Sequence, residues 1–361
     1  MGHKDTIYQD VLEFMRNPAA GEFEPLALRV FAFQYGRNLP YRRYCERRGA
    51  APGGIADWRD IPAVPTAAFK ELDLRCGPPV KVFMTSGTTR GVEKRGRHSL
   101  PRLDLYRASA LPNFRAHLLP DGARLKMLIL AASPEIRPDS SLSHMLEMVR
   151  EEYGERSSGY FFGKDSGVEV EALARELKSA AARGEPVFLL GITLAFHQFI
   201  EQCCENNQRF LLPPGSRLMD TGGFKGRRIE LSKTDLYRRY EETFGIPQTH
   251  LVNEYGMTEM GSQFYDNVLA DKYNGMDRPR HKRSPAWTRT LVLDPETLEE
   301  LPAGKTGLLR HFDLANCGTV LALQTDDLGH YTDHGFDISG RASAAEARGC
   351  SLTVEDIKKV K

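Results

Sequence analysis

The chain has 361 residues, 41% of them hydrophobic and 27% charged, so it is long enough for a large core and too apolar for a disordered protein. Its 49 basic and 48 acidic side chains leave a formal net charge of +1, which argues against a nucleic-acid-binding surface spread over the whole molecule. No apolar run approaches the ~18 residues of a membrane span. The N-terminus also lacks the apolar core of a signal peptide, so we expect a cytoplasmic protein without a membrane span.

The first 50 residues are predicted to be helical, because apolar side chains recur at helical spacing from Tyr8 to Met15 and again from Leu26 to Phe33. The strongly basic stretch 37–50 is interpreted as a solvated helix face. Residues 51–80 are rich in proline and glycine, which predicts an extended segment with one short helix near Ala67–Leu72.

Between residues 100 and 255, short apolar runs alternate with amphipathic segments. We expect helices at Leu103–Leu119, Ser140–Tyr153, Glu169–Arg183, Thr193–Cys204 and Thr234–Phe244, and strands at Leu125–Ala132, Val187–Ile192, Leu218–Asp220 and Thr249–Asn253. This alternation favours an α/β fold with mostly parallel sheets flanked by helices. From Thr288 onward the pattern changes to short strands at 290–293, 307–312 and 320–324, which predicts a smaller β-rich part near 285–340.

The six cysteines are scattered and include no Cys-x-x-Cys pair, so neither a disulfide framework nor a zinc ribbon is indicated. His197, Cys203 and Cys204 share one predicted helix and imitate part of a metal site. Because no fourth ligand is in view, a structural role is favoured for all three.

A candidate phosphate-binding loop follows the predicted strand Val80–Met84. Its residues are Thr85, Ser86, Gly87, Thr88 and Thr89, and the basic residues after them are Arg90, Lys94, Arg95, Arg97 and His98. Glycine lets backbone N–H groups turn inward, hydroxyls add donors, and the basic side chains neutralise phosphate oxygens. The alternative is a polar turn that leads into a solvated basic loop.

Two later segments complete a pattern that resembles the acyl-adenylate-forming enzymes. The stretch Asn253–Glu259 (NEYGMTE) is similar to their YGxTE motif, and Gln324–Leu328 with Gly340-Arg341 is similar to their TGD and GR motifs. All of them occur in the family's order. The sequence also departs from the family pattern, which usually has glycine at the positions of Arg90 and Asp326.

Within that superfamily the chain most resembles the acyl-protein synthetases of bacterial luciferase operons, in the segments Ile61–Thr66, Thr221–Gly226 and Arg348–Leu352. The resemblance implies one adenylate-forming domain over residues 1–340. It also implies that the family's mobile C-terminal domain is missing or reduced to a short tail at 341–361, since only 20 residues follow Arg341.

The resemblance assigns ATP and Mg²⁺ as cofactors. It implies that nucleotide contacts come from Thr85, Ser86, Gly87, Thr88, Thr89, Gly222, Gly223, Phe224, Glu254, Tyr255, Gly256, Thr258, Asp327 and Arg341. Glu259 would hold Mg²⁺, which takes oxygen ligands and is often bound by one carboxylate plus phosphates. The same resemblance suggests His144 for the acyl pocket, although a lone histidine is more often structural. The implied catalytic residues are Thr85, Glu259, Arg341 and Cys350.

Cys350 is the residue of greatest interest in the tail. A thiolate is a good acyl acceptor, and the neighbouring Arg348 would lower its pKa. The resembling synthetases load such a cysteine with an acyl group and pass it to a reductase partner. Our leading hypothesis is therefore ATP-dependent activation of a carboxylic acid, a fatty acid by resemblance, followed by thioester formation on Cys350.

Other functions stay open at this point. The acyl group could pass to coenzyme A, a carrier protein or an amine, or the chain could be a non-catalytic nucleotide-binding subunit of a reductase. The intact set Ser86, Glu259, Asp327 and Arg341 disfavours the last of these. Gly304-Lys305-Thr306 imitates the end of a Walker A loop, but position 299 is glutamate where that motif needs glycine, so 297–307 is predicted to be a surface hairpin. The sequence does not determine the oligomeric state.

Overall fold

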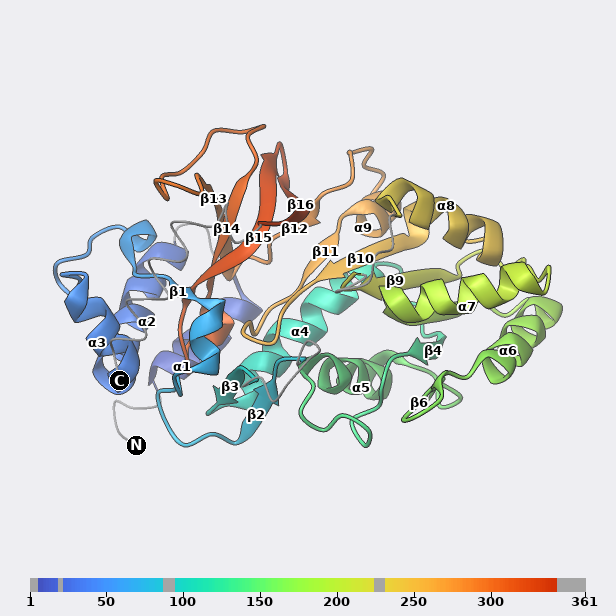
Figure 1. The fold of residues 1–361 in the computed structure, drawn as a ribbon, viewed down its shortest axis with the longest axis horizontal. Coiled ribbons are helices and arrows are strands. Elements are labelled where there is room, and N and C mark those ends of the chain that lie inside the picture. The colour runs from blue at the N-terminus through green and yellow to red at the C-terminus, as the bar shows by residue number, and fades with distance from the viewer. Residues whose placement is uncertain (1–5, 19–21, 87–94, 224–230, 343–361) are drawn as a thin grey trace. The chain divides into compact units, whose positions relative to one another are not determined.

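The computed structural model describes all residues except 1–5, 19–21, 87–94, 224–230 and 343–361. It separates into two compact units, each drawn with its own strands and helices in Figure 1. Unit 1 comprises residues 1–110, 257–263 and 281–361, and unit 2 comprises residues 111–256 and 264–280. The chain passes from unit 2 to unit 1 within the NEYGMTE segment, between Gly256 and Met257.

Unit 2 has the α/β order that the sequence predicts. Its helices are α5 (Ser141–Tyr153), α6 (Val170–Arg183), α7 (Thr193–Glu205), α8 (Lys233–Phe244), α9 (Val268–Tyr273), the 3-10 turn η3 (Gln248–His250) and the second half of α4 (Leu103–Leu118). Its strands are β4 (Lys126–Leu130), β5 (Gly159–Tyr160), β6 (Phe162–Gly163), β7 (Gly167–Val168), β8 (Val187–Ile192), β9 (Arg217–Thr221), β10 (Leu251–Tyr255) and β11 (Phe264–Asp266). Strands β5, β4, β8, β9 and β10 pair in parallel in that order, and β11 pairs antiparallel to β10.

The parallel strands of unit 2 are covered on both faces, as their near-continuous apolar sequences require. Leu189 of β8 packs in a core with residues of α6, α7 and α8, whose ribbons lie alongside the strands in Figure 1. The preceding Phe188 points to the opposite face, where its ring lies 5.8 Å from that of Phe114 in α4. Alternate side chains of one strand therefore hold helices on both sides.

Unit 1 combines helices from the N-terminus with an antiparallel sheet. Its helices are α1 (Thr6–Arg16), α2 (Phe23–Arg37), α3 (Leu39–Arg47), the first half of α4, and the 3-10 turns η1 (Trp58–Asp60), η2 (Thr66–Lys70) and η4 (Leu314–Asn316). Its strands are β1 (Val64–Pro65), β2 (Lys81–Met84), β3 (Arg97–Leu100), β12 (Lys282–Arg283), β13 (Thr288–Leu293), β14 (Gly307–Asp313), β15 (Ala322–Thr332) and β16 (Gly335–Arg341). The antiparallel order is β13, β14, β15, β16 and β12, with β1 parallel to β15, while β2 and β3 form a separate hairpin.

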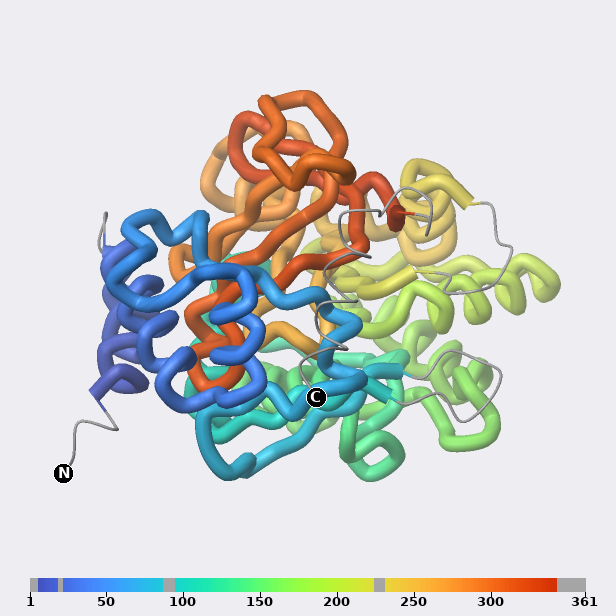
Figure 2. Tube along the Cα trace, turned by 60° about the vertical axis from the view of Figure 1, so that its left-hand side comes forward, coloured from blue at the N-terminus to red at the C-terminus, as the bar shows by residue number. Residues whose placement is uncertain are grey.

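Helix α2 packs against the connection between β14 and β15, and both elements lie side by side in Figures 1 and 2. The side chain of Gln34 is fully buried there and bonds three backbone groups. Its Nε2 donates to the carbonyls of Asn316 and Cys317 at 2.9 and 3.2 Å, and its Oε1 accepts from Leu321 N at 3.0 Å. A connection 282 residues away in sequence is thus held by one side chain of α2.

Most of the predicted helices and strands are confirmed within one or two residues, and Val187–Ile192 has the bounds that we predicted. The short helix predicted near 67–72 is confirmed as a 3-10 helix at Thr66–Lys70. Two details are wrong. Arg97 and His98 belong to strand β3 rather than to a basic loop, and the strand predicted at 320–324 begins at Ala322 and continues to Thr332. The predicted surface hairpin at 297–307 is confirmed as the connection between the antiparallel strands β13 and β14.

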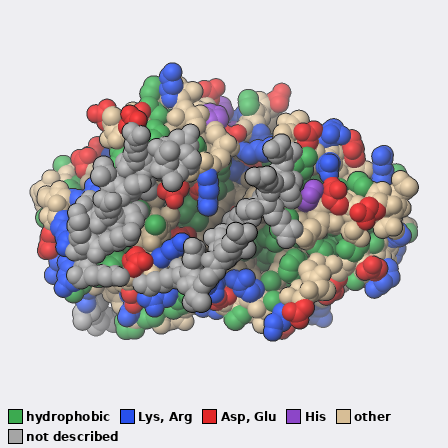
Figure 3. Space-filling model, in the orientation of Figure 1, with side chains coloured by type: hydrophobic (Ala, Val, Ile, Leu, Met, Phe, Trp, Pro, Cys, Tyr) green, Lys and Arg blue, Asp and Glu red, His purple; other side chains and the backbone are tan. Residues whose placement is uncertain are grey.

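Basic and acidic side chains are interspersed over the face drawn in Figure 3, as the balanced composition leads one to expect. In the part of the chain that the structure describes, none of the helices combines the length and apolar character that crossing a membrane requires.

Replacing His311 with Asn is expected to reduce the loss of stability that the protein shows on acidification. His311 is fully buried in β14, and burial lowers its pKa from 6.5 to about 3. The unfolded chain therefore takes up a proton below pH 6.5 that the folded chain does not. The stabilisation that neutral His311 provides is complete above pH 6.5 and declines as the pH falls toward about 3.

Between pH 7.5 and pH 5 the wild type should lose about 2 kcal/mol more unfolding free energy than the variant. Urea unfolding followed by tryptophan fluorescence measures this difference, because both tryptophans, Trp58 and Trp287, lie in unit 1. Equal pH dependence in the two proteins would contradict the prediction.

Candidate functional site

In unit 1, the candidate phosphate loop connects strands β2 and β3. Hydrogen bonds join Thr85, directly after β2, to Arg95 and Gly96, directly before β3. Thr85 N donates to Gly96 O at 2.9 Å, and Gly96 N donates to the Thr85 hydroxyl at 2.9 Å. Arg95 donates from Nε to Thr85 O at 2.6 Å. A Cβ atom on Gly96 would lie 3.0 Å from Thr85 Cγ2, a tight contact that glycine avoids. Ser86, which follows Thr85 in the chain, is exposed.

His98 corrects our interpretation of the basic run, because it is not one of the phosphate-neutralising cations. Its side chain is 1% exposed, and desolvation lowers its pKa to about 4, so it is neutral near pH 7. Nδ1 lies 2.7 Å from the Thr258 carbonyl oxygen and Nε2 lies 3.0 Å from the Thr319 hydroxyl. A carbonyl only accepts, so Nδ1 carries the proton.

The segment that contains Glu259 is bound firmly within unit 1. Glu259 is buried, and Asn316 Nδ2 donates to its backbone carbonyl at 2.9 Å. Asp313 accepts from Gly261 N at 3.1 Å and from the Ser262 hydroxyl at 2.7 Å. Burial raises the pKa of Asp313 to about 6. The backbone on both sides of Glu259 is thus fixed by side chains from β3, β14 and η4.

Asp327 and Arg341, the two residues that the resemblance assigns to the ribose, lie opposite each other on the antiparallel strands β15 and β16. Arg341 donates from Nε to Asp327 Oδ1 at 2.8 Å. The Asp327 side chain is 9% exposed whereas that of Arg341 is 71% exposed. The sequence pattern therefore paired two residues 14 positions apart that the structure brings into contact.

In unit 2, the candidate nucleotide residues follow the carboxyl ends of β9 and β10, the edge where parallel α/β sheets bind ligands. Gly222 and Gly223 are exposed, and Gly222 has a φ of 78°, a conformation that favours glycine. Thr193, the first residue of α7, supports this turn. Its hydroxyl lies 2.9 Å from Asp220 Oδ2 and 3.2 Å from the Gly222 carbonyl oxygen.

Glu254 and Tyr255 end the parallel strand β10. The Glu254 carboxylate is buried and accepts a short hydrogen bond from the Thr221 hydroxyl on the neighbouring strand β9. Tyr255 is half-buried, with its ring 5.9 Å from that of Phe264. Glu254 thus joins two strands, and Tyr255 retains exposed surface beyond them.

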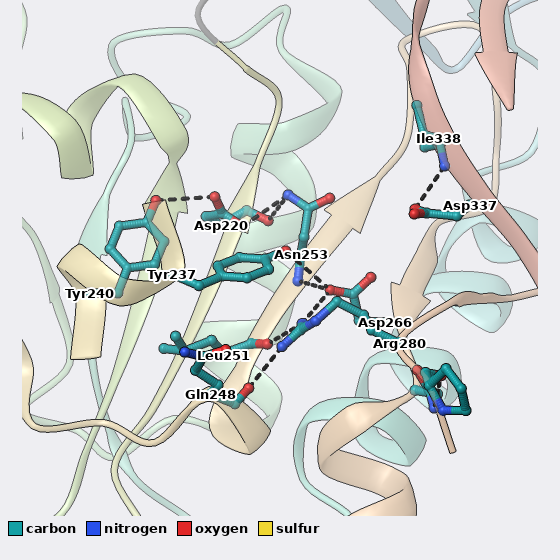
Figure 4. Close-up of polar contacts among 12 residues, drawn as sticks. Asp220, Tyr237, Tyr240, Gln248, Leu251, Asn253, Asp266, Arg280, Asp337 and Ile338 are labelled. Atoms are coloured by element: carbon teal, nitrogen blue, oxygen red, sulfur yellow. Dashed lines mark hydrogen bonds and ion pairs between the residues drawn. The ribbon is translucent and has the colours of Figure 1, made fainter. Parts of the chain in front are cut away.

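A buried polar network lies beneath these strand ends (Figure 4). Asp220 accepts from the Tyr240 hydroxyl at 3.1 Å and from Asn253 Nδ2 at 2.9 Å. Asp266 accepts from Asn253 N at 3.0 Å and pairs with Arg280 at 2.7 Å. The carboxylates are 1% and 2% exposed, and each has several donors. Asp220 thereby joins β9 to β10, and Asp266 joins β11 to β10.

Of the remaining candidate residues, some belong to the part of the chain that the structure describes and others do not. His144 lies in the first turn of α5 and is half-buried. Thr258 is half-buried in unit 1, and Gly256 is half-buried at the end of unit 2. The other predictions fall outside the described residues, namely Gly87, Thr88, Thr89, Phe224 and Cys350.

The residues present fit a nucleotide with Mg²⁺. The candidate groups of unit 1 are hydroxyls, a carboxylate and backbone amides, which are hard oxygen ligands and anion donors rather than sulfur or imidazole ligands. In the described residues no cluster of three or more metal-binding side chains occurs.

Sequence reasoning missed four residues that shape these sites: Thr193, Gly96, Asn316 and Thr319. Their roles arise from contacts with residues that are not neighbours in sequence, such as Glu259 for Asn316 and His98 for Thr319. Only Thr193 carried a local signal, since it stands at the junction of a predicted strand and a predicted helix.

Comparisons with known proteins agree on one family. A sequence model described as "Acyl-protein synthetase, LuxE" matches residues 8–358. The chain is 22% identical over 370 residues to a long-chain-fatty-acid–luciferin-component ligase of Aliivibrio fischeri, covering 96% of this chain and 93% of that protein. A protein of the same name from Vibrio harveyi is 23% identical over 344 residues, covering 90% and 85%.

Among solved structures, a 2-hydroxyisobutyryl-CoA ligase in an open conformation, in complex with 2-HIB-AMP and CoA, superimposes with a TM-score of 0.64. The two share 18% sequence identity, and the match covers 91% of this chain and 77% of that one. This likeness confirms the adenylate-forming-enzyme fold that the motifs predict.

We expect Cys204 to react faster with iodoacetamide than the buried cysteines of the described chain. Cys204 is exposed, whereas burial raises the pKa of Cys45 and of Cys203 to about 12 and leaves almost no thiolate at pH 8. Peptide mapping by mass spectrometry after brief labelling of the native protein measures the rates. In urea all three should react alike, and fast labelling of Cys203 in the native protein would contradict the prediction.

Proposed function

We propose that the chain, which belongs to the LuxE family of acyl-protein synthetases, activates a fatty acid with ATP and then transfers the acyl group to Cys350. Membership of that family makes the chain an acyl-activating ligase. The acid, the cofactors, the acceptor and the residue roles are our proposal. The observation that supports them is that the family match spans residues 8–358, and so includes every candidate residue and Cys350.

In the first step, the carboxylate of the acid attacks the α-phosphorus of ATP, and pyrophosphate leaves. This is a reaction between two anions, so the protein must orient them and offset their charge. The hydroxyls and amides of Thr85–Thr89 would bind the phosphates. Thr85, the first residue of this segment, is held by the hydrogen bond from Gly96 N to its hydroxyl. Glu259 would hold Mg²⁺, which supplies further positive charge at the phosphates.

The nucleoside half of ATP would be bound mainly by strand ends. Gly222, Gly223 and Phe224 would face the adenine, because absent side chains let a flat ring approach the backbone. Glu254, Tyr255, Gly256 and Thr258 would line the nucleotide. Asp327 would accept from the ribose hydroxyls while Arg341, its ion-pair partner, holds the carboxylate in place.

In the second step, the Cys350 thiolate attacks the acyl carbonyl carbon, the bond to AMP breaks, and a thioester forms. AMP leaves with the electron pair of that bond. The curated relatives are named as ligases of long-chain fatty acids, which supports a fatty acid as substrate here. His144 would contribute to the acyl pocket, and an acyl reductase is the proposed recipient of the thioester. We place this chemistry in the cytoplasm.

Replacing Cys350 with Ser is expected to abolish self-acylation. Intact-protein mass spectrometry after incubation with ATP, Mg²⁺ and a panel of carboxylic acids should show one added acyl group in the wild type. Hydroxylamine should remove it, because a thioester is labile to this nucleophile. Pyrophosphate release in a single turnover should continue in the variant, since the first step does not use the thiol.

Cys204→Ser is the matched control, because Cys204 is exposed and should keep its full reactivity in the wild type. This variant should be acylated normally. An adduct that persists in Cys350→Ser would contradict the assignment. Absence of any adduct, together with product formed on added coenzyme A, would identify an external acceptor instead.

Replacing Glu259 with Gln is expected to lower fatty-acid-dependent ATP–pyrophosphate exchange by about 100-fold, because glutamine keeps the shape but removes the anionic oxygen ligand. The exchange rate is measured over a range of Mg²⁺ concentrations, and excess Mg²⁺ should restore part of it. Glu299→Gln, at an exposed position between β13 and β14, serves as control. Equal Mg²⁺ dependence in both variants would refute the role of Glu259.

A further inference from the structure

The two peptide groups that flank the side chain of Glu259 are each held by a buried side chain of unit 1. His98 Nδ1 donates to the Thr258 carbonyl at 2.7 Å, and Asn316 Nδ2 donates to the Glu259 carbonyl at 2.9 Å. Both donors are buried, with exposed fractions of 1% and 0%. These two hydrogen bonds fix the peptide planes before and after the Glu259 Cα atom. The direction of its Cα–Cβ bond is therefore fixed as well.

Thr319 connects these two donors. Its hydroxyl lies 3.0 Å from His98 Nε2, and its backbone N–H donates to the Asn316 carbonyl oxygen at 2.8 Å. Because Nδ1 of neutral His98 carries the proton, Nε2 is an acceptor and the Thr319 hydroxyl donates to it. The Asn316 carbonyl is still satisfied, since Gln34 Nε2 donates to it at 2.9 Å. The orientation of every group in the cluster is therefore determined.

Asparagine at position 316 destabilises the folded state, and its hydrogen bond to the Glu259 carbonyl would explain why it is present. Asn316 Oδ1 is buried without a hydrogen-bond partner among the residues that the structure describes, and an unsatisfied buried oxygen destabilises the folded state. The opposite amide orientation would place that oxygen against the Glu259 carbonyl, where two acceptors repel. An apolar residue of similar shape would avoid the cost, so the donor to Glu259 is the feature that asparagine adds.

We propose that His98 and Asn316, joined by Thr319, are positioning residues that fix the direction of the Glu259 carboxylate toward the metal–nucleotide complex. The proposal rests on the proposed function, in which Glu259 holds Mg²⁺. Because His98 belongs to β3, the strand that returns from the phosphate loop, the hairpin that carries this loop is tied to the same peptide. Strand β3 and the peptide next to Glu259 are thereby joined within unit 1.

Substitutions at His98 distinguish a positioning role from mere space filling. In His98→Asn, a side-chain amide nitrogen occupies nearly the position of Nδ1 and can still donate to the Thr258 carbonyl. In His98→Gln, the amide reaches the position of Nε2 and that donor is lost. We expect Asn to restore function and Gln to fail. Asn316→Leu removes the second donor without a large change in shape.

The readout is binding rather than turnover. Mn²⁺ affinity in the presence of α,β-methylene-ATP, measured from the free-ion electron paramagnetic resonance signal, reports the metal site directly. We expect a 10- to 100-fold loss in His98→Gln and Asn316→Leu, the usual effect of removing a group that orients a metal ligand. The loss in His98→Asn should be less than about 3-fold. His311→Asn, another fully buried histidine of unit 1, should bind as the wild type does.

Two results would overturn the proposal in distinguishable ways. If Glu259→Gln weakens Mn²⁺ binding but His98→Gln and Asn316→Leu match the His311→Asn control, the positioning role is wrong and the proposed function stands. If Glu259→Gln binds Mn²⁺ as the wild type does, the metal role of Glu259 fails, and the positioning role fails with it. Urea unfolding followed by the two tryptophans verifies that each variant is folded.

Discussion

A buried backbone must have its polar groups paired, and this constraint governs unit 1 where the chain leaves β14. Residues 314–321 are no longer in a strand, yet all of them are buried. Some of their carbonyls accept from backbone N–H groups, and those of Asn316, Cys317 and Thr319 accept from the side chains of Gln34 and Asn38. The pairing that satisfies this loop also holds Asn316 and Thr319 where they reach the Glu259 segment.

Unit 2 also buries polar groups that must be paired, and there they include charged carboxylates. Asp220 and Asp266 are buried carboxylates, and each collects several donors, which is the condition under which a buried anion is tolerated. Arg280 neutralises Asp266 and packs its guanidinium 4.4 Å from the Tyr237 ring centroid. Hydrogen bonds thereby join the strand ends to one another, while Gly222 and Gly223, which follow β9, are exposed.

The sequence was most informative where side chains are uniformly buried or where hydroxyls, glycines and charges cluster. Val187–Ile192 was predicted with its true bounds because a strand buried on both faces is apolar throughout. His98 was misjudged because its neighbours are basic, and nothing local reveals that its partners lie 160 and 221 positions away. The predicted strand ended at Gln324, whereas β15 continues through Asp326 and Asp327, because one side chain faces solvent and the next pairs with Arg341.

The neutrality of His98 is consistent with what an acid-activating site requires. A protonated imidazole would place a fixed positive charge beside the segment that is proposed to hold a divalent cation, and would repel that ion in a medium of low dielectric constant. Burial without a carboxylate partner keeps the ring neutral while leaving its N–H donor intact. In the function that we propose, orientation is thus supplied by an uncharged group, and positive charge at the phosphates would come from the metal ion and from arginine and lysine side chains. The same burial that makes His98 a poor phosphate ligand makes it a suitable support for Glu259.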